Sequence, residues 1–149
     1  MNALFSESVT RSDRILVVDD IADNSFLLQM ILEEEGYQVE IADSGRQALE
    51  RIAVAPPDLV LLDVMMPDMN GFEVTQRIRQ DAALPFIPIL LITGYLDPHP
   101  ADGFDVGADD FIRKPIDVDL LLKRVHTILQ PRSARSNSEK SEPSSIARC

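Results

Sequence analysis

Residues 59–74 read LVLLDVMMPDMNGFEV, and this stretch contains the two patterns that decide the fold. It opens on Leu59–Leu62, a wholly apolar run typical of a strand that is buried on both faces of a parallel sheet. Gly71–Gln80 follows, with its apolar residues at helical spacing. The stretch therefore predicts a strand and a helix, joined by a loop that begins near Asp63.

The same unit recurs along most of the chain. Short apolar or alternating runs predict further strands, and stretches with helical spacing lie between them. The predicted strands are Arg14–Val18, Tyr37–Ile41, Leu59–Leu62, Pro88–Thr93 and Asp110–Arg113. The predicted helices run from Asp23 to Glu35, from the Ser44 cap to Pro56, from Gly71 to Gln80, and from the Asp117 cap to Leu129. This alternation predicts an α/β fold, a doubly wound five-stranded parallel sheet with helices on both faces.

Composition and charge exclude several classes of protein. The chain has 149 residues, 45% hydrophobic and 26% charged, a balance typical of one folded domain. Its net charge of −11 argues against direct binding to nucleic acid or to an anionic membrane. No apolar run approaches the roughly 18 residues of a membrane span, and the N-terminus has no secretory pattern. The only cysteine, Cys149, cannot form an internal disulfide, so we predict a cytoplasmic protein.

Three segments of the chain differ in composition. Residues 13–131 carry the alternating pattern and are predicted to form the domain. Residues 1–12 precede the first strand and are predicted to be a flexible arm. Residues 132–149 are rich in serine and contain a single aliphatic residue, so they cannot bury enough apolar surface to offset the entropy of ordering. We predict that this tail is disordered.

Polar residues with complementary chemistry stand at the ends of four predicted strands. Asp19 and Asp20 follow the first strand, Asp63 follows the third, Thr93 closes the fourth, and Lys114 follows the fifth. Ligands of doubly wound sheets bind beyond the carboxyl ends of the strands, so we expect these side chains to meet at one edge. A single aspartate after a strand is usually a helix cap or a turn residue. Independent caps would not supply matching chemistry at one edge, so the set indicates a site.

The charges of this set limit what the site can do. Three clustered carboxylates repel one another and titrate abnormally unless a cation neutralises them. Their hard oxygen atoms suit Mg²⁺, which usually takes one or two carboxylates together with substrate oxygens. One of the carboxylates could instead act as a nucleophile toward a phosphoryl group. The hydroxyl of Thr93 and the ammonium of Lys114 would then stabilise the charge on the transferred group.

Four motifs, in order and in register with the strands, point to one family. They are ILVVDD at 15–20, LVLLDVMMPDMNGFEV at 59–74, PILLITG at 88–94 and GADDFIRKP at 107–115. In these motifs the chain resembles the response-regulator receiver domains of two-component signalling. The resemblance implies the flavodoxin-like receiver fold. It also implies a phosphoacceptor switch rather than an enzyme that acts on a separate substrate.

The resemblance further implies the roles of the acidic residues. Asp63 would accept a phosphoryl group from a sensor histidine kinase or a histidine phosphotransfer protein. One Mg²⁺ would be bound by Asp20, Asp63 and the backbone carbonyl of Met65, with Asp19 assisting, often through water. The chain would act as a single-domain response regulator that controls an unknown output protein, passes its phosphoryl group on in a relay, or pairs with a second copy of itself.

The remaining site residues are implied in the same way. Thr93 and Lys114 would contact the phosphoryl oxygens, and the Lys114–Pro115 peptide bond would be cis. In this family an aromatic residue three positions before the lysine turns inward with the threonine. That position holds Phe111, for which an ordinary place in the core is the alternative.

Two bulky residues beside the acceptor, Met65 and Tyr95, occupy positions that set the phosphoryl lifetime in the family. Neither is an acid or an amide able to orient water, so slow autodephosphorylation is expected. The segment between Thr93 and Phe111 departs from the family pattern, because two prolines and a glycine fall where a fourth helix is usual. Proline costs about 3 kcal/mol and glycine about 1 kcal/mol in a helix interior, so we predict a short or irregular helix there.

The first predicted helix has more apolar residues than one buried side needs. They cover roughly 240° of the helix at 100° per residue, whereas a core face needs little more than about 100°. We expect Phe26 and Met30 to be left exposed. Members of the family dock their kinases on this helix, so we interpret the surplus as a partner surface. The alternative is that the last helix and the N-terminal arm cover it.

Other functions fit the fold less well. A small Mg²⁺-dependent phosphohydrolase would need a second acid–base aspartate two residues after the nucleophile, where the chain has Met65. A nucleotide- or flavin-binding module would need a phosphate-binding loop after the first strand, where the chain has Asp19, Asp20 and Ile21. A docking module that acts without phosphorylation would have no use for the complete set of site residues.

Overall fold

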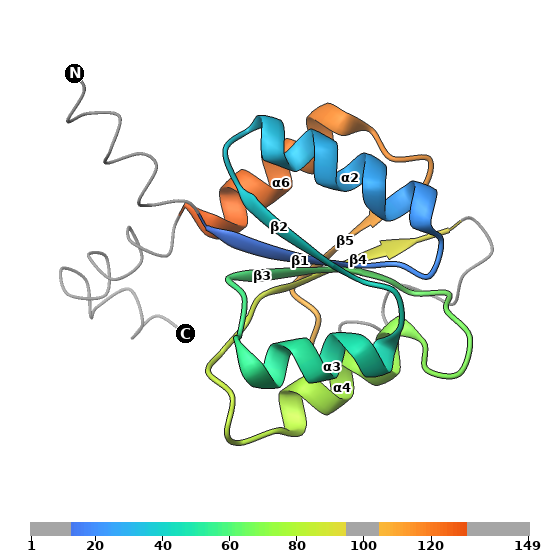
Figure 1. The fold of residues 1–149 in the computed structure, drawn as a ribbon, viewed down its shortest axis with the longest axis vertical. Helices are drawn as coiled ribbons and strands as arrows, with labels where there is room; N and C mark the ends of the chain where they lie inside the picture. The colour runs from blue at the N-terminus through green and yellow to red at the C-terminus, as the bar shows by residue number, and fades with distance from the viewer. Residues whose placement is uncertain (1–12, 95–104, 131–149) are drawn as a thin grey trace, which may run out of the picture.

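The structure is a computed structural model of the chain and describes residues 13–94 and 105–130 (Figure 1). The strands are β1 (Arg14–Val18), β2 (Gln38–Ala42), β3 (Leu59–Asp63), β4 (Ile89–Thr93) and β5 (Asp110–Arg113). The helices are α2 (Ala22–Glu34), α3 (Gly45–Val54), α4 (Gly71–Gln80) and α6 (Val118–Leu129). These elements confirm the predicted alternation. The predicted arm, the tail, Tyr95 and most of the segment expected to form an irregular fourth helix lie outside the described residues.

The strands form one parallel sheet in the order β2-β1-β3-β4-β5. β1 pairs with β2 on one side and with β3 on the other, so that Val17 lies between Ile41 and Leu61. Every pairing is parallel, which confirms the predicted doubly wound sheet. The carboxyl ends of all the strands therefore lie at the same edge. Within the described part of the chain, no helix has the length and apolar character needed to cross a membrane.

Strand β2 begins one residue later than its predicted start at Tyr37. The reason lies at the end of α2, where Gly36 has a φ of 98°, in the left-handed region that glycine adopts readily. The amide of Tyr37 donates to the carbonyl of Leu32 at 3.3 Å and so completes the helix terminus. The strand ladder therefore begins with Gln38, which pairs with Arg14.

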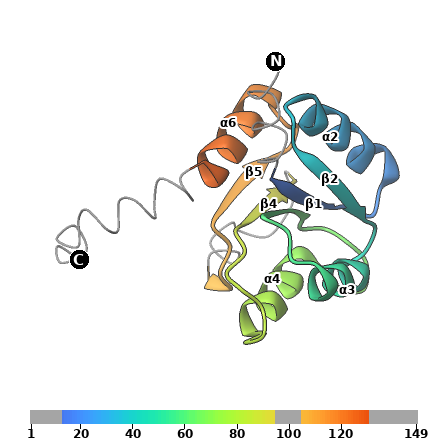
Figure 2. The same cartoon turned by 60° about the vertical axis from the view of Figure 1, so that its left-hand side comes forward.

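Helices cover both faces of the sheet. Figure 1 shows α2 and α6 on one face and α3 and α4 on the other, and the turned view of Figure 2 shows the same layers. Successive strand residues alternate between two cores. Val60 and Leu62 belong to the core beneath α3 and α4, whereas Leu59 and Leu61 belong to the core beneath α2 and α6. This alternation explains why the run at the start of the 59–74 stretch is wholly apolar.

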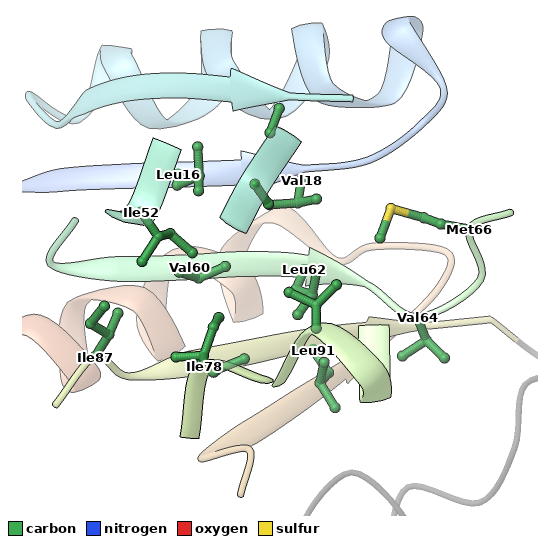
Figure 3. Close-up of a cluster of buried hydrophobic side chains, with 14 residues drawn as sticks. Leu16, Val18, Ile52, Val60, Leu62, Val64, Met66, Ile78, Ile87 and Leu91 are labelled. Atoms are coloured by element: carbon green, nitrogen blue, oxygen red, sulfur yellow. The ribbon is translucent and has the colours of Figure 1, made fainter. Parts of the chain in front are cut away.

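The core beneath α3 and α4 is drawn in Figure 3. Leu16, Val60 and Leu91, from three adjacent strands, meet Ile52 of α3 and Ile78 of α4 there. Each of these side chains is at least 97% buried. Burying one such side chain contributes about 1.5–3 kcal/mol, so the two cores supply the main stabilisation of the fold.

Three of the helices begin at side-chain caps. Ser44 and Asp117 each accept a hydrogen bond from the backbone amide three residues on, as predicted from the sequence. Asn70 and Glu73 form a capping box at the start of α4. The start of α2, by contrast, has no side-chain cap at Ile21. These helix starts follow the carboxyl ends of the strands, so both lie at the same edge of the domain.

Arg79 of α4 anchors the chain where it enters β5. Its side chain donates to the carbonyls of Gly107 at 2.9 Å and Ile87 at 2.7 Å, and it pairs with Asp109 at 2.9 Å. The guanidinium also lies 4.7 Å from the ring centroid of Phe86. Burial lowers the pKa of Arg79, and the charge of Asp109 opposes that shift. The sequence analysis did not anticipate this anchor, which ties α4 to the starts of β4 and β5.

Candidate functional site

Three carboxylates meet at the carboxyl edge of the sheet. Asp63 is the last residue of β3, and Asp19 and Asp20 directly follow the neighbouring strand β1. One oxygen from each carboxylate lies within 4.8 Å of those of the other two. Asp19 and Asp63 are buried, whereas Asp20 is exposed. The structure thus confirms the convergence that the strand ends predict.

Asp19 is held in place by the backbone at the start of α2. Its Oδ1 accepts a hydrogen bond from the amide of Ile21 at 2.8 Å, and its own amide donates to the carbonyl of Ala42 at 3.1 Å. The first bond turns the chain toward the helix, and the second continues the ladder between β1 and β2. Asp19 is therefore both a structural residue and a member of the acidic cluster.

Lys114 reaches the cluster from β5. Its Nζ lies 3.0 Å from Oδ1 of Asp63. The backbone brings it there, because the amide of Lys114 donates to the carbonyl of Thr93 at 2.7 Å and extends the ladder between β4 and β5. The Lys114–Pro115 peptide bond is cis, as the resemblance implied. The structure therefore joins the ammonium to the three acids.

The pKa of Asp63 is raised from its ordinary value of 3.8 to about 6. Burial is the largest cause, since it disfavours the charged form, and the hydrogen bond from Lys114 opposes it. The negative charges of Asp19 and Asp20 raise the pKa further. A divalent cation at the cluster would lower this pKa and keep the carboxylate ionised. The donor set, made of hard oxygen atoms, fits Mg²⁺.

Thr93 lies beside the cluster and is fully buried at the end of β4. Asp63 pairs with Ile92, the residue before it. Among residues 13–94 and 105–130, the Oγ1 hydroxyl of Thr93 has no hydrogen-bond partner. Leaving a buried hydroxyl without a partner costs about 1–3 kcal/mol. Thr93 therefore offers a donor that an added oxygen at Asp63 could satisfy.

The remaining predicted residues occupy different surroundings. Phe111 is half-buried and packs against the core beneath α3 and α4, with the guanidinium of Arg113 5.7 Å from its ring centroid. This placement agrees with the core alternative, and the role as a switch stays a prediction. Met65, two residues after Asp63, is 58% exposed.

The exposed side of α2 confirms the surplus of apolar residues. Phe26 and Met30 are 59% and 53% exposed, as expected. Leu27, which the sequence analysis did not single out, is 56% exposed. A cavity of about 250 Å³ adjoins this side, and its walls include Leu27, Val118 and Lys114. The apolar side of α2, formed by Phe26, Leu27 and Met30, therefore approaches the acidic cluster through Leu27, which lines the cavity together with Asp19.

Residues 15–126 match the response regulator receiver domain family over most of the chain. The chain belongs to this family. Receiver domains act in two-component systems, where they interact with histidine kinases or phosphotransfer proteins, and their fold is typical of phosphoacceptor switches. The identification agrees with the resemblance drawn from the four sequence motifs.

Curated relatives of this receiver domain are longer proteins. The chain is 39% identical over 138 residues to a probable cyclic di-GMP phosphodiesterase of Vibrio cholerae, which covers 91% of the chain and 31% of that protein. It is 45% identical over 119 residues to the response regulator PleD of Caulobacter vibrioides, with 78% of the chain and 26% of PleD covered. Against the DNA-binding response regulator MtrA of Mycobacterium tuberculosis the chain spans 58% of the relative. The match in each case spans less than two thirds of the relative.

Solved structures share the receiver fold. The chemotaxis protein CheY4 of Vibrio cholerae is 34% identical with a TM-score of 0.73, covering 79% of this chain and 99% of that one. The signal receiver domain of a histidine kinase from Syntrophus aciditrophicus is 36% identical with a TM-score of 0.74, covering 80% and 91%. Together with the strand order, these likenesses confirm the flavodoxin-like receiver fold.

Gly71 lies at the carboxyl edge of the sheet, whereas the sequence analysis placed it only in a helix. Its amide donates to the carbonyl of Val64 at 2.8 Å, so it closes the loop that follows Asp63. The one signal in the sequence is a glycine directly after the cap residue Asn70. Such a glycine is compatible with many helix starts, so its close approach to β3 could not be read from the sequence.

Proposed function

We propose that this receiver domain is a phosphoacceptor switch whose acceptor is Asp63. A phosphohistidine on a sensor histidine kinase or a histidine phosphotransfer protein supplies the phosphoryl group. The chain then controls a partner protein or passes the group on in a relay. The observation that carries this proposal is the buried carboxylate of Asp63 with the Lys114 ammonium 3.0 Å away, beside two further acids.

The transfer exchanges one bond to phosphorus for another. An oxygen of the ionised Asp63 carboxylate forms a P–O bond while the P–N bond to the histidine breaks. The imidazole leaves with the bonding electrons and takes up a proton from solvent, and the product is an acyl phosphate. Lys114 lies where its ammonium can pass from the carboxylate to a phosphoryl oxygen. Mg²⁺, when bound, offsets the negative charge of the reacting oxygens.

The acidic cluster would hold this ion. Asp20, Asp63 and the backbone carbonyl of Met65 are the proposed ligands, with Asp19 assisting. Two observations support this proposal. One oxygen from each carboxylate lies within 4.8 Å of the others, and Asp20 is exposed, so that a hydrated ion can reach the cluster from solvent. Burial, with a smaller contribution from the charges of Asp19 and Asp20, raises the pKa of Asp63 despite the hydrogen bond from Lys114, and a cation at the cluster would favour the ionised form.

Phosphorylation would change the contacts of Thr93 and Lys114. The modification replaces one negative charge with about two and adds strong acceptor oxygens. Lys114 can pair with this charge, and the buried hydroxyl of Thr93 can donate to a phosphoryl oxygen. Phe111, on the neighbouring strand β5, is the proposed residue that responds to movement of Thr93. These changes would bias the domain between two conformations.

Two surfaces complete the proposal. The apolar side of α2, at Phe26, Leu27 and Met30, would dock the phosphodonor. The cavity that Leu27 and Lys114 line together supports this role.

Met65, exposed beside the acceptor, and Tyr95 would slow hydrolysis of the acyl phosphate, since neither orients water. If so, Met65→Asn changes the decay rate of phosphorylated Asp63, whereas an unchanged rate removes Met65 from this role.

The proposed function is tested by mass spectrometry of the intact chain after incubation with acetyl phosphate. We expect a gain of one phosphoryl group that requires Mg²⁺ and is absent from Asp63→Asn. The matched control is Asp58→Asn, a carboxylate at the opposite end of β3 that accepts a hydrogen bond from the amide of Arg14. Incubation with a phosphorylated histidine phosphotransfer protein extends the test to donors that require docking.

The outcomes separate the alternatives. Phosphorylation of Asp58→Asn but not of Asp63→Asn supports the proposal. Modification of both variants would place the acceptor elsewhere. If neither donor modifies the chain, the proposal is wrong and a docking module that acts without phosphorylation takes its place.

A further inference from the structure

The loop between β3 and α4 is closed by a single backbone hydrogen bond. It leaves the strand at the buried residue Val64 and returns at Gly71, whose amide donates to the Val64 carbonyl at 2.8 Å. Within the loop, Asp68 has a φ of 68°, and the amide of Met69 donates to the carbonyl of Pro67 at 2.7 Å. The loop is therefore a short, tightly turned segment whose two ends meet directly after the acidic residue of β3.

Gly71 lies against the backbone of the strand end at a distance that only glycine permits. A Cβ atom on Gly71 would stand 2.6 Å from the carbonyl oxygen of Asp63 and 2.9 Å from the Cα of Val64. Both contacts are shorter than the van der Waals limit, and both are with main-chain atoms. Backbone atoms in a paired strand cannot rotate away as a side chain can. Any side chain at this position must therefore move either the helix start or the strand end.

Hydrogen bonds hold both the helix start and the strand end in place. The Oγ1 of Thr75, which is fully buried, donates to the carbonyl of Gly71 at 2.8 Å. The capping box of Asn70 and Glu73 fixes the residue before Gly71 with two hydrogen bonds of 2.9 Å. At the strand end, the amide of Val64 donates to the carbonyl of Ile92 at 3.0 Å. We therefore expect a larger residue to displace the Asp63–Val64 backbone together with the helix start.

Gly45, at the start of α3, provides an internal comparison. A Cβ atom there would meet the Cγ2 of Val74 at 2.8 Å and the Sδ of Met69 at 3.0 Å. Both neighbours are side-chain atoms, which can shift by rotation. A substitution at Gly45 should therefore disturb packing without displacing the acceptor strand.

We propose that Gly71 is a positioning residue for the metal and phosphoacceptor site. By bringing α4 against the end of β3 it sets where the carboxylate of Asp63 stands relative to Asp19 and Asp20. It also sets the course of the loop that carries the Met65 carbonyl. This inference rests on the proposed function, because it assumes that the acidic cluster binds Mg²⁺.

The test is the Mg²⁺ affinity of Gly71→Ala, measured by isothermal titration on the full chain. We expect binding about tenfold weaker than in the wild type, since displaced supporting contacts typically cost 10–100-fold in metal affinity. Gly45→Ala should lose stability as well but keep the wild-type affinity. Two-dimensional NMR spectra of both variants with added Mg²⁺ report on the folded fraction, so that unfolding is not mistaken for weak binding.

A second variant keeps the test decisive. Thr75→Val removes the hydrogen bond to the Gly71 carbonyl while keeping the side-chain shape, and we expect a smaller loss of Mg²⁺ affinity in the same direction. It replaces Gly71→Ala if that variant does not fold even in sucrose, which favours compact states. Wild-type Mg²⁺ affinity in Gly71→Ala would overturn the inference. If only Thr75→Val can be measured, wild-type affinity in that variant would overturn it. A loss of affinity in Gly45→Ala equal to that in Gly71→Ala would also overturn it. If the wild type itself binds no Mg²⁺, the proposed function fails instead.

Discussion

The middle of the sheet and its carboxyl edge are built from opposite kinds of side chain. In β3 the residues Val60–Leu62 are apolar and fully buried, and the same strand ends on Asp63, which is charged and only 3% exposed. In β4 the apolar Leu91 is followed two residues later by Thr93, which is buried without a partner among the described residues. Burying apolar groups stabilises the fold, whereas burying unpaired polar groups opposes it. The buried polar groups at the edge therefore lower the stability of the fold, and the apolar residues in the middle of the sheet supply most of it.

The largest effect is expected from the middle of the sheet. Leu91→Ala removes a buried side chain from the core drawn in Figure 3 and leaves a cavity. We expect the free energy of unfolding to fall by about 2–5 kcal/mol, as measured by urea denaturation. A loss below 1 kcal/mol would show that the core can collapse around the gap, and would weaken the contrast with the edge.

At the edge, the sign of the effect should reverse. Asp63→Asn removes a carboxylate whose pKa is raised to about 6, so the variant should be more stable than the wild type at pH 7 without Mg²⁺. A shift of this size corresponds to about 3 kcal/mol, at 1.36 kcal/mol per unit, and we expect a gain of that order.

The pH dependence of this gain follows from the direction of the shift. The folded chain binds the Asp63 proton more tightly than the unfolded chain, so this group stabilises the fold below the ordinary pKa of 3.8. That contribution is lost as the pH rises through about 6. Urea denaturation of both proteins should therefore show the advantage of Asp63→Asn growing with pH. Added Mg²⁺ should reduce it. A gain that does not vary with pH would contradict the assigned cause.

A smaller gain is expected from Thr93→Val. The substitution keeps the side-chain shape and removes the buried hydroxyl, so the unphosphorylated domain should be more stable by about 1 kcal/mol in urea denaturation. The same variant should bind the phosphoryl analogue beryllofluoride more weakly. Loss of stability would instead reveal that the Thr93 hydroxyl is already paired.

The smallest effect on stability is expected on the exposed side of α2. Phe26→Ala removes a side chain that is 59% exposed, so unfolding should change by no more than about 0.5 kcal/mol. Phosphotransfer from the kinase or phosphotransfer protein should slow, while phosphorylation by acetyl phosphate should not. The buried Leu28 on the same helix is the control, since Leu28→Ala should destabilise without that selectivity. Equal transfer rates for Phe26→Ala and wild type would remove this surface from the docking role.

Much of the fold could be predicted from local patterns. The apolar runs, the caps at Ser44 and Asp117, and the alternation of strands with helices involve neighbouring residues, whose periodicity reports directly on burial. The start of β2 could not be predicted from such patterns, because it depends on the end of the preceding helix. There the hydrogen bond between the Tyr37 amide and the Leu32 carbonyl completes a helix end, and the identity of Tyr37 does not predict this bond.

The sequence by itself determined which residues would meet at the carboxyl edge. Parallel strands joined by helices bring their carboxyl ends together, so Asp19, Asp63 and Lys114 had to converge once the alternation was recognised. The match of residues 15–126 to the receiver domain family agrees with the motifs on those strands. The exposure of Phe26 and Met30 also followed from counting apolar residues around one helix.

Only the tertiary structure decided how these groups interact. The 3.0 Å contact between Lys114 and Asp63 joins residues 51 positions apart. The raised pKa of Asp63, the Thr93 hydroxyl that has no partner in the described part of the chain, and the close approach of Gly71 all depend on the packing of elements distant in the chain. Local periodicity encodes which side of an element is buried. The distances between elements, in which differences of about a few tenths of an ångström change electrostatics and strain, are set only when the whole core is packed.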